Sequence, residues 1–323
     1  DYNWTETLMK NVGGRMDGIS LHYYTVTGWN GSKGSATNFN KDDYYWTMGK
    51  CLEIEDVVRK HIQIMDKYDP QKKIGLMVDE WGTWWDEEPG TINGHLYQQN
   101  TMRDAMVAAL DKAGVQVHVH AIGDGAVRNT LNAFENAIKE NGERADRRYT
   151  MTHVCAVADE DIKRIADLGV ISALQFLWMY RDPLCELEIA YIGEERAMAM
   201  YPVKNMLEAG CIVSGASDGP VTPFAPLEEI EVAVTRNSPY PGEEDTDMHR
   251  WPEQAITPYQ ALEAYTKNVA FENFMEDLVG TIEVGKKADL AVLDQNILTC
   301  DPKKISDSTV RYTISDGRIV HEG

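Results

Sequence analysis

Three polar residues in the C-terminal two thirds of the chain each stand at the end of a short apolar segment. They are His120, His153 and Asp218. In parallel β/α folds the carboxyl ends of the strands meet at one face, so we expect these side chains to lie together. Neutral imidazoles and a carboxylate are ligands for Zn²⁺ and similar divalent ions. The pattern predicts a metal site, with zinc as the expected ion.

A metal at this position would support hydrolysis. A bound divalent ion lowers the pKa of its water toward neutrality and polarises a carbonyl oxygen. The Asp218 carboxylate could take the proton of the water and pass it to the leaving group. A single histidine near a strand more often has a packing role, and we favour that role for His118, which shares a face with His120. The three strand-end residues together favour a catalytic site.

The elements that must position these residues alternate along the chain. Helical apolar spacing predicts helices over 54–68, 102–113 and 127–138, and Thr257-Pro-Tyr-Gln260 predicts a capping box. Such alternation indicates parallel β/α units, of which we count about six, whereas a closed barrel has eight. We therefore predict an α/β fold, a TIM-type (β/α) barrel that is incomplete or hybrid. Short apolar strands are expected over 19–24, 74–78, 115–121, 149–153, 170–174 and 211–216.

The character of the sequence changes near Val279. From there to Gly323 it is punctuated by glycine and rich in strand-forming residues. Residues 310–320, with Asp316-Gly317 as the turn, predict a hairpin. This part is expected to form a small β element beside the barrel.

Composition excludes several classes of partner. The 323 residues carry a net charge of −21, which disfavours nucleic acid and anionic membranes. We find no run of 18 apolar residues and no signal-peptide pattern, so no membrane span is expected. Five widely spaced cysteines indicate reduced thiols and a cytoplasmic location. The expected partners are a small-molecule substrate and, for an oligomer, a second copy of the chain.

The second part of the chain resembles a known family. The motifs are His120-Ala-Ile-Gly-Asp124, the segment ending at His153, Gly193-Glu-Glu-Arg196, Ser217-Asp-Gly-Pro-Val221 and Gly285-Lys-Lys-Ala-Asp-Leu290. Together they are similar to the amidohydrolase superfamily, and most similar to its amidohydrolase-3 branch, which includes N-substituted formamide deformylases.

This resemblance assigns roles to individual residues. It implies that His120 and His153 are the histidine ligands of the fifth and sixth barrel strands. It implies that Asp218 is the aspartate of the eighth strand, which binds metal and shuttles protons. Gln175 matches a glutamine after the seventh strand, and Trp178 stands where the family often has other substrate contacts.

The chain also departs from the pattern of this family. The family opens with a His-x-His pair on its first strand and often has a bridging carboxylated lysine or carboxylate on the fourth. The only His-x-His in this sequence is His118-Val-His120, which belongs to the fifth strand, and residues 1–114 contain no such pair. An extension of this interpretation is that Glu80 replaces the bridging ligand.

The first part of the chain resembles a different family. Met16-Asp-Gly-Ile-Ser-Leu-His-Tyr-Tyr24 and Val78-Asp-Glu-Trp-Gly-Thr-Trp-Trp85 are similar to the α-L-arabinofuranosidase family of retaining glycoside hydrolases. The resemblance implies that Glu80 is the nucleophile and that His22 and Tyr24 line the sugar site. Trp81 is suited to stacking on a sugar ring. Retaining hydrolysis needs a second carboxyl group, but the Asn-Glu pair that carries it in the family does not occur before Glu80.

The chain is therefore interpreted as a chimera. Residues 1–110 form a glycoside-hydrolase-like fragment, 111–278 an amidohydrolase-like barrel fragment and 279–323 a small β element. Three functions follow: a metal-dependent hydrolase of amide-type C–N bonds, a retaining arabinofuranosidase-like enzyme acting through Glu80, and a non-catalytic hybrid with both sites incomplete.

Overall fold

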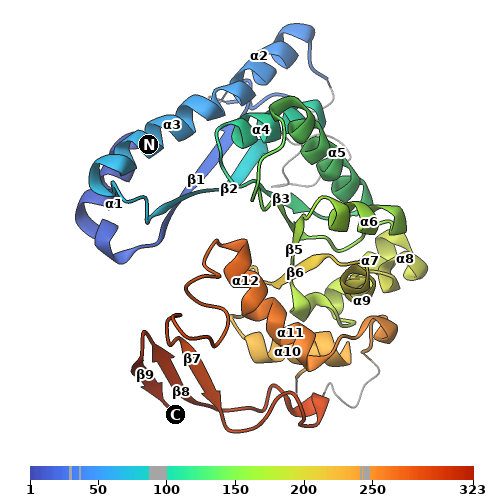
Figure 1. Cartoon of the computed structure of the whole chain (residues 1–323). Coiled ribbons are helices and arrows are strands. Elements are labelled where there is room, and N and C mark those ends of the chain that lie inside the picture. The colour runs from blue at the N-terminus through green and yellow to red at the C-terminus, as the bar shows by residue number, and fades with distance from the viewer. Residues whose placement is uncertain (29–30, 36–37, 87–99, 241, 243–247) are drawn as a thin grey trace. The chain divides into compact units, whose positions relative to one another are not determined.

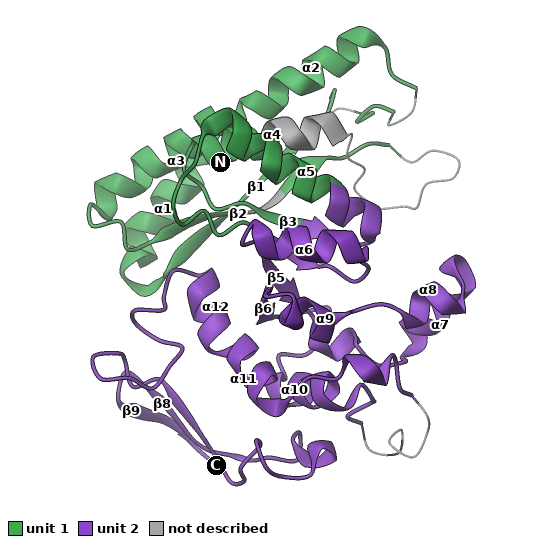
Figure 2. Cartoon of the chain, turned by 45° about the vertical axis from the view of Figure 1, so that its right-hand side comes forward, with its two compact units in different colours: residues 1–119, 129–149 green, residues 120–128, 150–323 purple. Residues whose placement is uncertain are grey.

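The fold is described from a computed structural model of the whole chain. Residues 1–28, 31–35, 38–86, 100–240, 242 and 248–323 are described, without the side chains of 79–80 and 100–105. The chain divides into two compact units, residues 1–119 with 129–149 and residues 120–128 with 150–323. Figure 2 shows the two units in different colours, and each is considered by itself.

The first unit is built around a pair of parallel strands. β1 and β2 pair directly, with His22 beside Glu80 and Tyr24 beside Gly82 in the register. Helices α1 and α3 pack together, and Met9, Ile19 and Met65 form a small buried cluster. The elements of this unit (Figure 1) are α1 (Tyr2–Val12), η1 (Gly13–Arg15), β1 (Gly18–Thr25), α2 (Lys41–Leu52), α3 (Ile54–Tyr68), β2 (Gly75–Thr83) and α4 (Asn100–Lys112), with parts of β3 (His118–Ala121) and α5 (Asp124–Asn141).

The apolar periodicity of α3 determined its boundaries. The predicted helix over 54–68 is confirmed, and its buried face carries Ile54, Val58, His61 and Met65. His61 is 3% exposed, and its Nδ1 lies 2.8 Å from the Thr5 hydroxyl oxygen. A polar ring is tolerated on this apolar face because that hydrogen bond compensates for lost hydration.

The second unit contains the other elements. Its four-stranded sheet has the order β3-β4-β5-β6, and the β4–β5 and β5–β6 pairs are parallel. The helices and strands are β4 (Thr150–His153), α6 (Asp159–Asp167), β5 (Ile171–Leu174), η2 (Phe176–Trp178), α7 (Pro183–Ile192), α8 (Glu194–Met198), α9 (Val203–Glu208), β6 (Ile212–Gly215), α10 (Pro226–Thr235), η3 (Pro252–Gln254), α11 (Pro258–Tyr265), α12 (Lys267–Glu272), β7 (Leu290–Leu293), η4 (Pro302–Lys304), β8 (Val310–Ser315) and β9 (Arg318–Glu322).

Local sequence signals account for several boundaries in this unit. The predicted capping box is present, because Thr257 accepts from the backbone of Gln260 while Gln260 accepts from that of Thr257. The predicted terminal hairpin is also present as β8 and β9. Its turn residues Asp316 and Gly317 have φ values of +49° and +76°, the positive values that a type I′ turn requires.

The α/β class with parallel strands is confirmed, whereas the TIM-type barrel, incomplete or hybrid, remains a prediction. In the described part of the chain the six strands β1 to β6 form a pair and a sheet of four. The small β element is an antiparallel sheet of order β7-β8-β9. Across the described residues, none of the helices is both long and apolar enough to span a membrane.

A buried carboxylate in α4 stabilises the first unit. Asp111 is 3% exposed and accepts hydrogen bonds from Arg147 Nε at 2.8 Å and Asn141 Nδ2 at 2.9 Å. Burial alone would raise the pKa of Asp111, but these donors hold it below its ordinary value. Because the charge of Asp111 is buried, removing one side of this set of hydrogen bonds would leave the other side uncompensated, which is strongly destabilising.

We predict that Asp111→Ala destabilises the protein by about 3–5 kcal/mol, because it leaves the buried Arg147 without its carboxylate. Urea unfolding measures the loss. Because the folded-state pKa is lowered, the contribution is present above about pH 4 and decreases as acidification protonates Asp111. Asp167→Ala, which removes an exposed partner of Lys163, is the control and should cost less than about 1 kcal/mol. Equal losses in the two variants would contradict the prediction.

Candidate functional site

The structure brings two of the three predicted ligands together. The rings of His120 and His153 lie 4.4 Å apart between centroids, in an edge-to-face arrangement with 69° between their planes. His120 stands on β3 and His153 is the last residue of β4, which is the neighbouring strand. His120 is exposed and His153 is 3% exposed. The pair therefore has one imidazole open to solvent and one in the interior.

Gln175 fixes the tautomer of His153. Its Oε1 lies 2.7 Å from His153 Nδ1, and Gln175 is itself buried. Since an amide oxygen only accepts, Nδ1 carries the proton and Nε2 keeps its lone pair. The Trp178 ring stacks on the His153 ring, with 5.2 Å between the ring centroids and 7° between the planes. The predicted substrate contacts Gln175 and Trp178 are thus neighbours of His153, and their contact with substrate remains a prediction.

The surroundings of His153 keep its ring neutral. Burial lowers the pKa of His153 below its ordinary value, while the hydrogen bond to Gln175 and the negative charge of Asp218 act in the opposite direction. A neutral imidazole with a free Nε2 is the form that binds metal or accepts a proton. Burial at this position therefore favours the neutral form of the His153 imidazole.

The backbone at His153 turns sharply to place the ring. His153 and Val154 have φ values of +76° and +43°, in a region that residues with a Cβ rarely adopt. The Val154 N–H donates to the Ala121 carbonyl at 3.1 Å, which ties the end of β4 to β3. Strained residues of this kind persist where the surrounding structure holds them.

Asp218 lies at the end of β6 on an exposed turn. Its φ is +55°, and its carbonyl accepts from the Val221 N–H at 2.9 Å. The preceding Ser217 donates to Glu229 Oε1 at 2.7 Å, and Tyr265 donates to Glu229 Oε2. Glu229 is fully buried on α10. The turn that carries Asp218 is therefore anchored from the interior.

Sequence reasoning did not find the Ser217–Glu229–Tyr265 network. Burial raises the pKa of the Glu229 carboxyl, although both hydroxyl donors oppose the rise. The Tyr265 ring packs so closely on the Gly215 backbone that a Cβ at position 215 would clash with it. A glutamate among the apolar residues Ile230, Val232 and Ala233 was the only signal in the sequence, and such a signal is weak.

The donor set fits a divalent ion in chemistry but is not assembled as a complete centre. Across the described residues, no three histidine, cysteine, aspartate or glutamate side chains are grouped closely enough to hold a metal. The rings of His120 and His153 are adjacent, and the negative charge of Asp218 interacts electrostatically with His153. Catalytic zinc sites have three protein ligands, so Asp218 would have to join the histidine pair to complete one.

The predicted sugar-site residues lie in the first unit. His22 on β1 is exposed, and Tyr24 meets Trp84 edge-on at 5.6 Å between ring centroids. Trp81 is 6% exposed, and its indole N–H donates to the His118 carbonyl at 3.3 Å. Glu80 is in register with His22, but its side chain lies outside the described part of the structure. The roles of these residues in sugar binding remain predictions.

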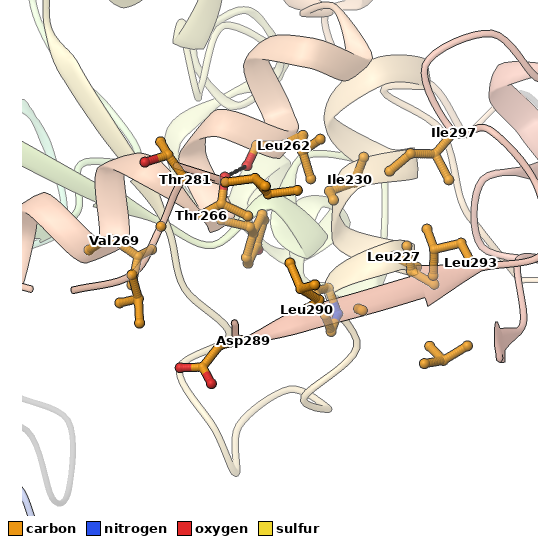
Figure 3. A pocket seen from close by; sticks show the side chains of 18 of the residues that line it. Leu227, Ile230, Leu262, Thr266, Val269, Thr281, Asp289, Leu290, Leu293 and Ile297 are labelled. Atoms are coloured by element: carbon orange, nitrogen blue, oxygen red, sulfur yellow. Dashed lines mark hydrogen bonds between the residues drawn. The ribbon is translucent and has the colours of Figure 1, made fainter. Parts of the chain in front are cut away.

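A cavity of about 1130 Å³ lies elsewhere in the second unit. Figure 3 shows its apolar side chains from α10, α11 and β7 facing one another, while Asp289 points away. The Thr266 hydroxyl at its wall is already used, because it donates to the Leu262 carbonyl at 2.7 Å. None of His120, His153 and Asp218 lines this cavity, so it is separate from the candidate site.

Comparison with known proteins assigns the part of the chain that contains this site. Residues 72–321 match the family model described as the amidohydrolase family. The chain belongs to the amidohydrolase family. A relative is the N-substituted formamide deformylase of Arthrobacter pascens, which is 29% identical over 236 residues, covering 72% of this chain and 41% of that protein.

A second similarity concerns the N-terminal region. The intracellular exo-alpha-L-arabinofuranosidase of Bacteroides ovatus is 79% identical over 138 residues, which cover 43% of this chain and 27% of that protein. The prediction of a chimera of two families is thereby confirmed. The chain spans less than half the length of each of these two relatives.

The fold of this chain is also similar to that of solved structures. An uncharacterized metal-dependent hydrolase from Pyrococcus horikoshii superposes with a TM-score of 0.54 at 18% identity, over 83% of this chain and 62% of that one. At this identity the likeness concerns the fold alone. It supports the mixed α/β class.

We predict that Gln175→Ala lowers the pKa of His153 further, because the hydrogen bond to Gln175 is one of the two interactions that raise it. NMR titration of the His153 ring measures the pKa. In the variant, the neutral ring should also lose its preference for carrying the proton on Nδ1. Gln295→Ala, which removes a glutamine that bonds to Lys304 and Ser308, is the control and should leave His153 unchanged. A His153 pKa that does not move in Gln175→Ala would refute this account.

Proposed function

We propose that this amidohydrolase hydrolyses an amide-type C–N bond of a small molecule. The observation that carries the proposal is the adjacent His120–His153 pair at the ends of neighbouring strands, inside the region that matches the family. The relative from Arthrobacter pascens is named for a reaction on N-substituted formamides. A formamide or a similar simple amide is therefore the substrate class to test first.

The proposed cofactor is a divalent ion, with zinc as the first candidate, and His120, His153 and Asp218 are the residues that would hold it. Such an ion supplies activated water and polarises the substrate carbonyl when bound. His153 presents Nε2 because Gln175 holds its Nδ1–H. Asp218 is exposed at the end of β6 and is proposed to take a proton from water and return it to the leaving nitrogen.

We predict that the protein, purified with zinc, releases 4-nitroaniline from 4-nitroformanilide. Asp218→Asn should lower kcat by about 10²–10⁴-fold, the usual contribution of a general acid–base. His153→Ala should lower both turnover and bound zinc, measured by absorbance and by elemental analysis. His321→Ala removes an exposed histidine on β9, which belongs to a different sheet from His120 and His153, and is the matched control.

Two outcomes would count against this proposal. One is turnover that is equal in Asp218→Asn and the unchanged protein. The other is zinc content that is the same in His153→Ala and His321→Ala. Since Asp218 is exposed, its replacement is expected to preserve folding, which circular dichroism can verify.

A second candidate function is glycoside hydrolysis through Glu80. It is supported by the 79% identity to an arabinofuranosidase and by the pairing of His22 with Glu80 in the register of β1 and β2. A retaining enzyme forms a covalent glycosyl–enzyme intermediate on its nucleophile.

The localisation of the protein in the cytoplasm remains a prediction.

We predict for this second function a burst of nitrophenol from 4-nitrophenyl α-L-arabinofuranoside and an adduct on Glu80 detected by mass spectrometry. The activated leaving group lessens the need for a general acid. Glu80→Gln should abolish both signals, whereas Asp79→Asn at the neighbouring position is the control. Absence of both signals in the unchanged protein would reject the function, and absence of both activities would leave the non-catalytic hybrid.

A further inference from the structure

The large cavity of the second unit has an apolar wall contributed by three helices and a strand. Its volume of about 1130 Å³ is slightly above the range of about 300–1,000 Å³ that is usual for small-molecule pockets. In Figure 3 the side chains of Ile230 on α10, Leu262 on α11 and Leu290 on β7 face one another. Val269 on α12 also lines the space. A wall of this kind favours a ligand with a long hydrocarbon part, because burial removes its apolar surface from water.

Several polar side chains of the wall already form hydrogen bonds within the protein. Besides Thr266, Thr281 Oγ1 donates to Glu283 Oε1 at 2.8 Å. Gln295 Nε2 donates to the Lys304 carbonyl at 2.6 Å. Because these donors are in use, they add little to the selection of a ligand.

Glu228 differs from its neighbours on α10, which carries three glutamates. Glu229 accepts from two hydroxyl groups, and Glu231 accepts from the Ser306 N–H at 2.8 Å. Glu228 lines the cavity, and its Oε2 is buried without a hydrogen-bond partner in the described part of the structure. A buried acceptor without a donor costs free energy. Glu228 is therefore the carboxylate that gains most from a donor on a ligand.

The Glu228 carboxylate can present either oxygen to such a donor. The residue is half-buried, and the terminal torsion of a glutamate side chain is broad and roughly two-fold. Rotation about this bond therefore exchanges the two oxygens at little cost. A cationic donor suits the position best, because hydrogen bonds between two charged groups are shorter and stronger than neutral ones.

We propose that this cavity binds a primary amine that carries a long unbranched hydrocarbon chain. The ammonium group donates to the Glu228 carboxylate, and the chain lies against Ile230, Leu262 and Leu290. Burial of the chain supplies most of the affinity, whereas the charged hydrogen bond fixes the orientation of the ligand.

The other charged residues of the wall are compatible with a cation. Asp289 points away from the space in Figure 3, and its Oδ1 accepts from the Asp316 N–H at 2.6 Å. Lys287 is exposed, so water solvates its ammonium group. The whole chain carries −21, a net charge that attracts cationic amphiphiles and repels anionic ones.

Isothermal titration calorimetry of the full chain tests the proposal with three probes of equal chain length, each below its micellar concentration. Decylamine should bind about tenfold more tightly than 1-decanol, because a hydrogen bond to a charged group contributes more than a neutral one. Decanoate should bind most weakly. From hexylamine to decylamine, each added methylene should tighten binding by about three- to fourfold, a dependence that pairing with a surface carboxylate would not produce.

Four variants locate the two parts of the ligand. Glu228→Gln keeps the shape of the side chain and should weaken decylamine binding by about tenfold while leaving 1-decanol unchanged. Leu290→Trp and Val269→Trp each fill part of the space and should weaken the binding of both probes. Val320→Trp changes an exposed residue of β9 outside the wall. It is the control and should bind as the unchanged protein does.

Several outcomes would overturn the proposal. One is the absence of decylamine binding to the unchanged protein, and another is an affinity for decylamine that Glu228→Gln does not alter. Decanoate binding as tight as that of decylamine would assign the space to an anion beside Lys287. Binding that persists in both Leu290→Trp and Val269→Trp would place the amine elsewhere on the acidic surface.

Two controls complete the test. Circular dichroism of each variant, compared with Val320→Trp, shows whether a loss of binding reflects unfolding. Sedimentation velocity with and without decylamine examines a second copy as the occupant, since a dimer that the amine dissociates would contradict the proposal. Binding is measured without turnover, so the result does not depend on the proposed hydrolysis.

Discussion

The candidate site depends on the register of three parallel strands. Thr152 on β4 lies beside Ala173 on β5, which lies beside Ser214 on β6. Because the strands run in the same direction, the residues that follow them emerge at one edge of the sheet. His153, Gln175 and Asp218 are those residues. A shift of one residue in β4 or β5 would send the side chains of that strand to the other face, and the contact of His153 with Gln175 would be lost.

The second requirement is that the interior below this edge contains polar groups whose hydrogen bonds are satisfied. Gln175 and Glu229 are both buried, and each is held by a partner at hydrogen-bonding distance. A buried carboxylate without donors would cost several kcal/mol. The two hydroxyls of Ser217 and Tyr265 offset that cost. The same bonds fix the turn on which Asp218 stands, so stability and positioning have a common origin.

The local structure of the chimeric sequence is continuous through the predicted joint between its two families. The predicted joint near residue 110 falls within α4, and Met106, Val107 and Leu110 are fully buried. The apolar spacing that predicted a helix over 102–113 continues through this position, and α4 forms there. Helix formation requires only that spacing and adequate propensity. The catalytic constellations have no such tolerance, because they need side chains from several strands.

The sequence by itself determined the local elements and the family of the main part. Apolar spacing placed α3, the Thr257-Gln260 capping box marked the start of α11, and Asp316-Gly317 marked the hairpin turn, because each signal acts between residues a few positions apart. Short motifs also indicated the similarity to two families. Only the tertiary structure decided that Gln175 and Trp178 hold the ring of His153, and that Glu229 anchors the turn of Asp218. Those contacts join residues separated by 12 to 36 positions or lying on different strands, and no periodicity encodes which buried polar group will meet which.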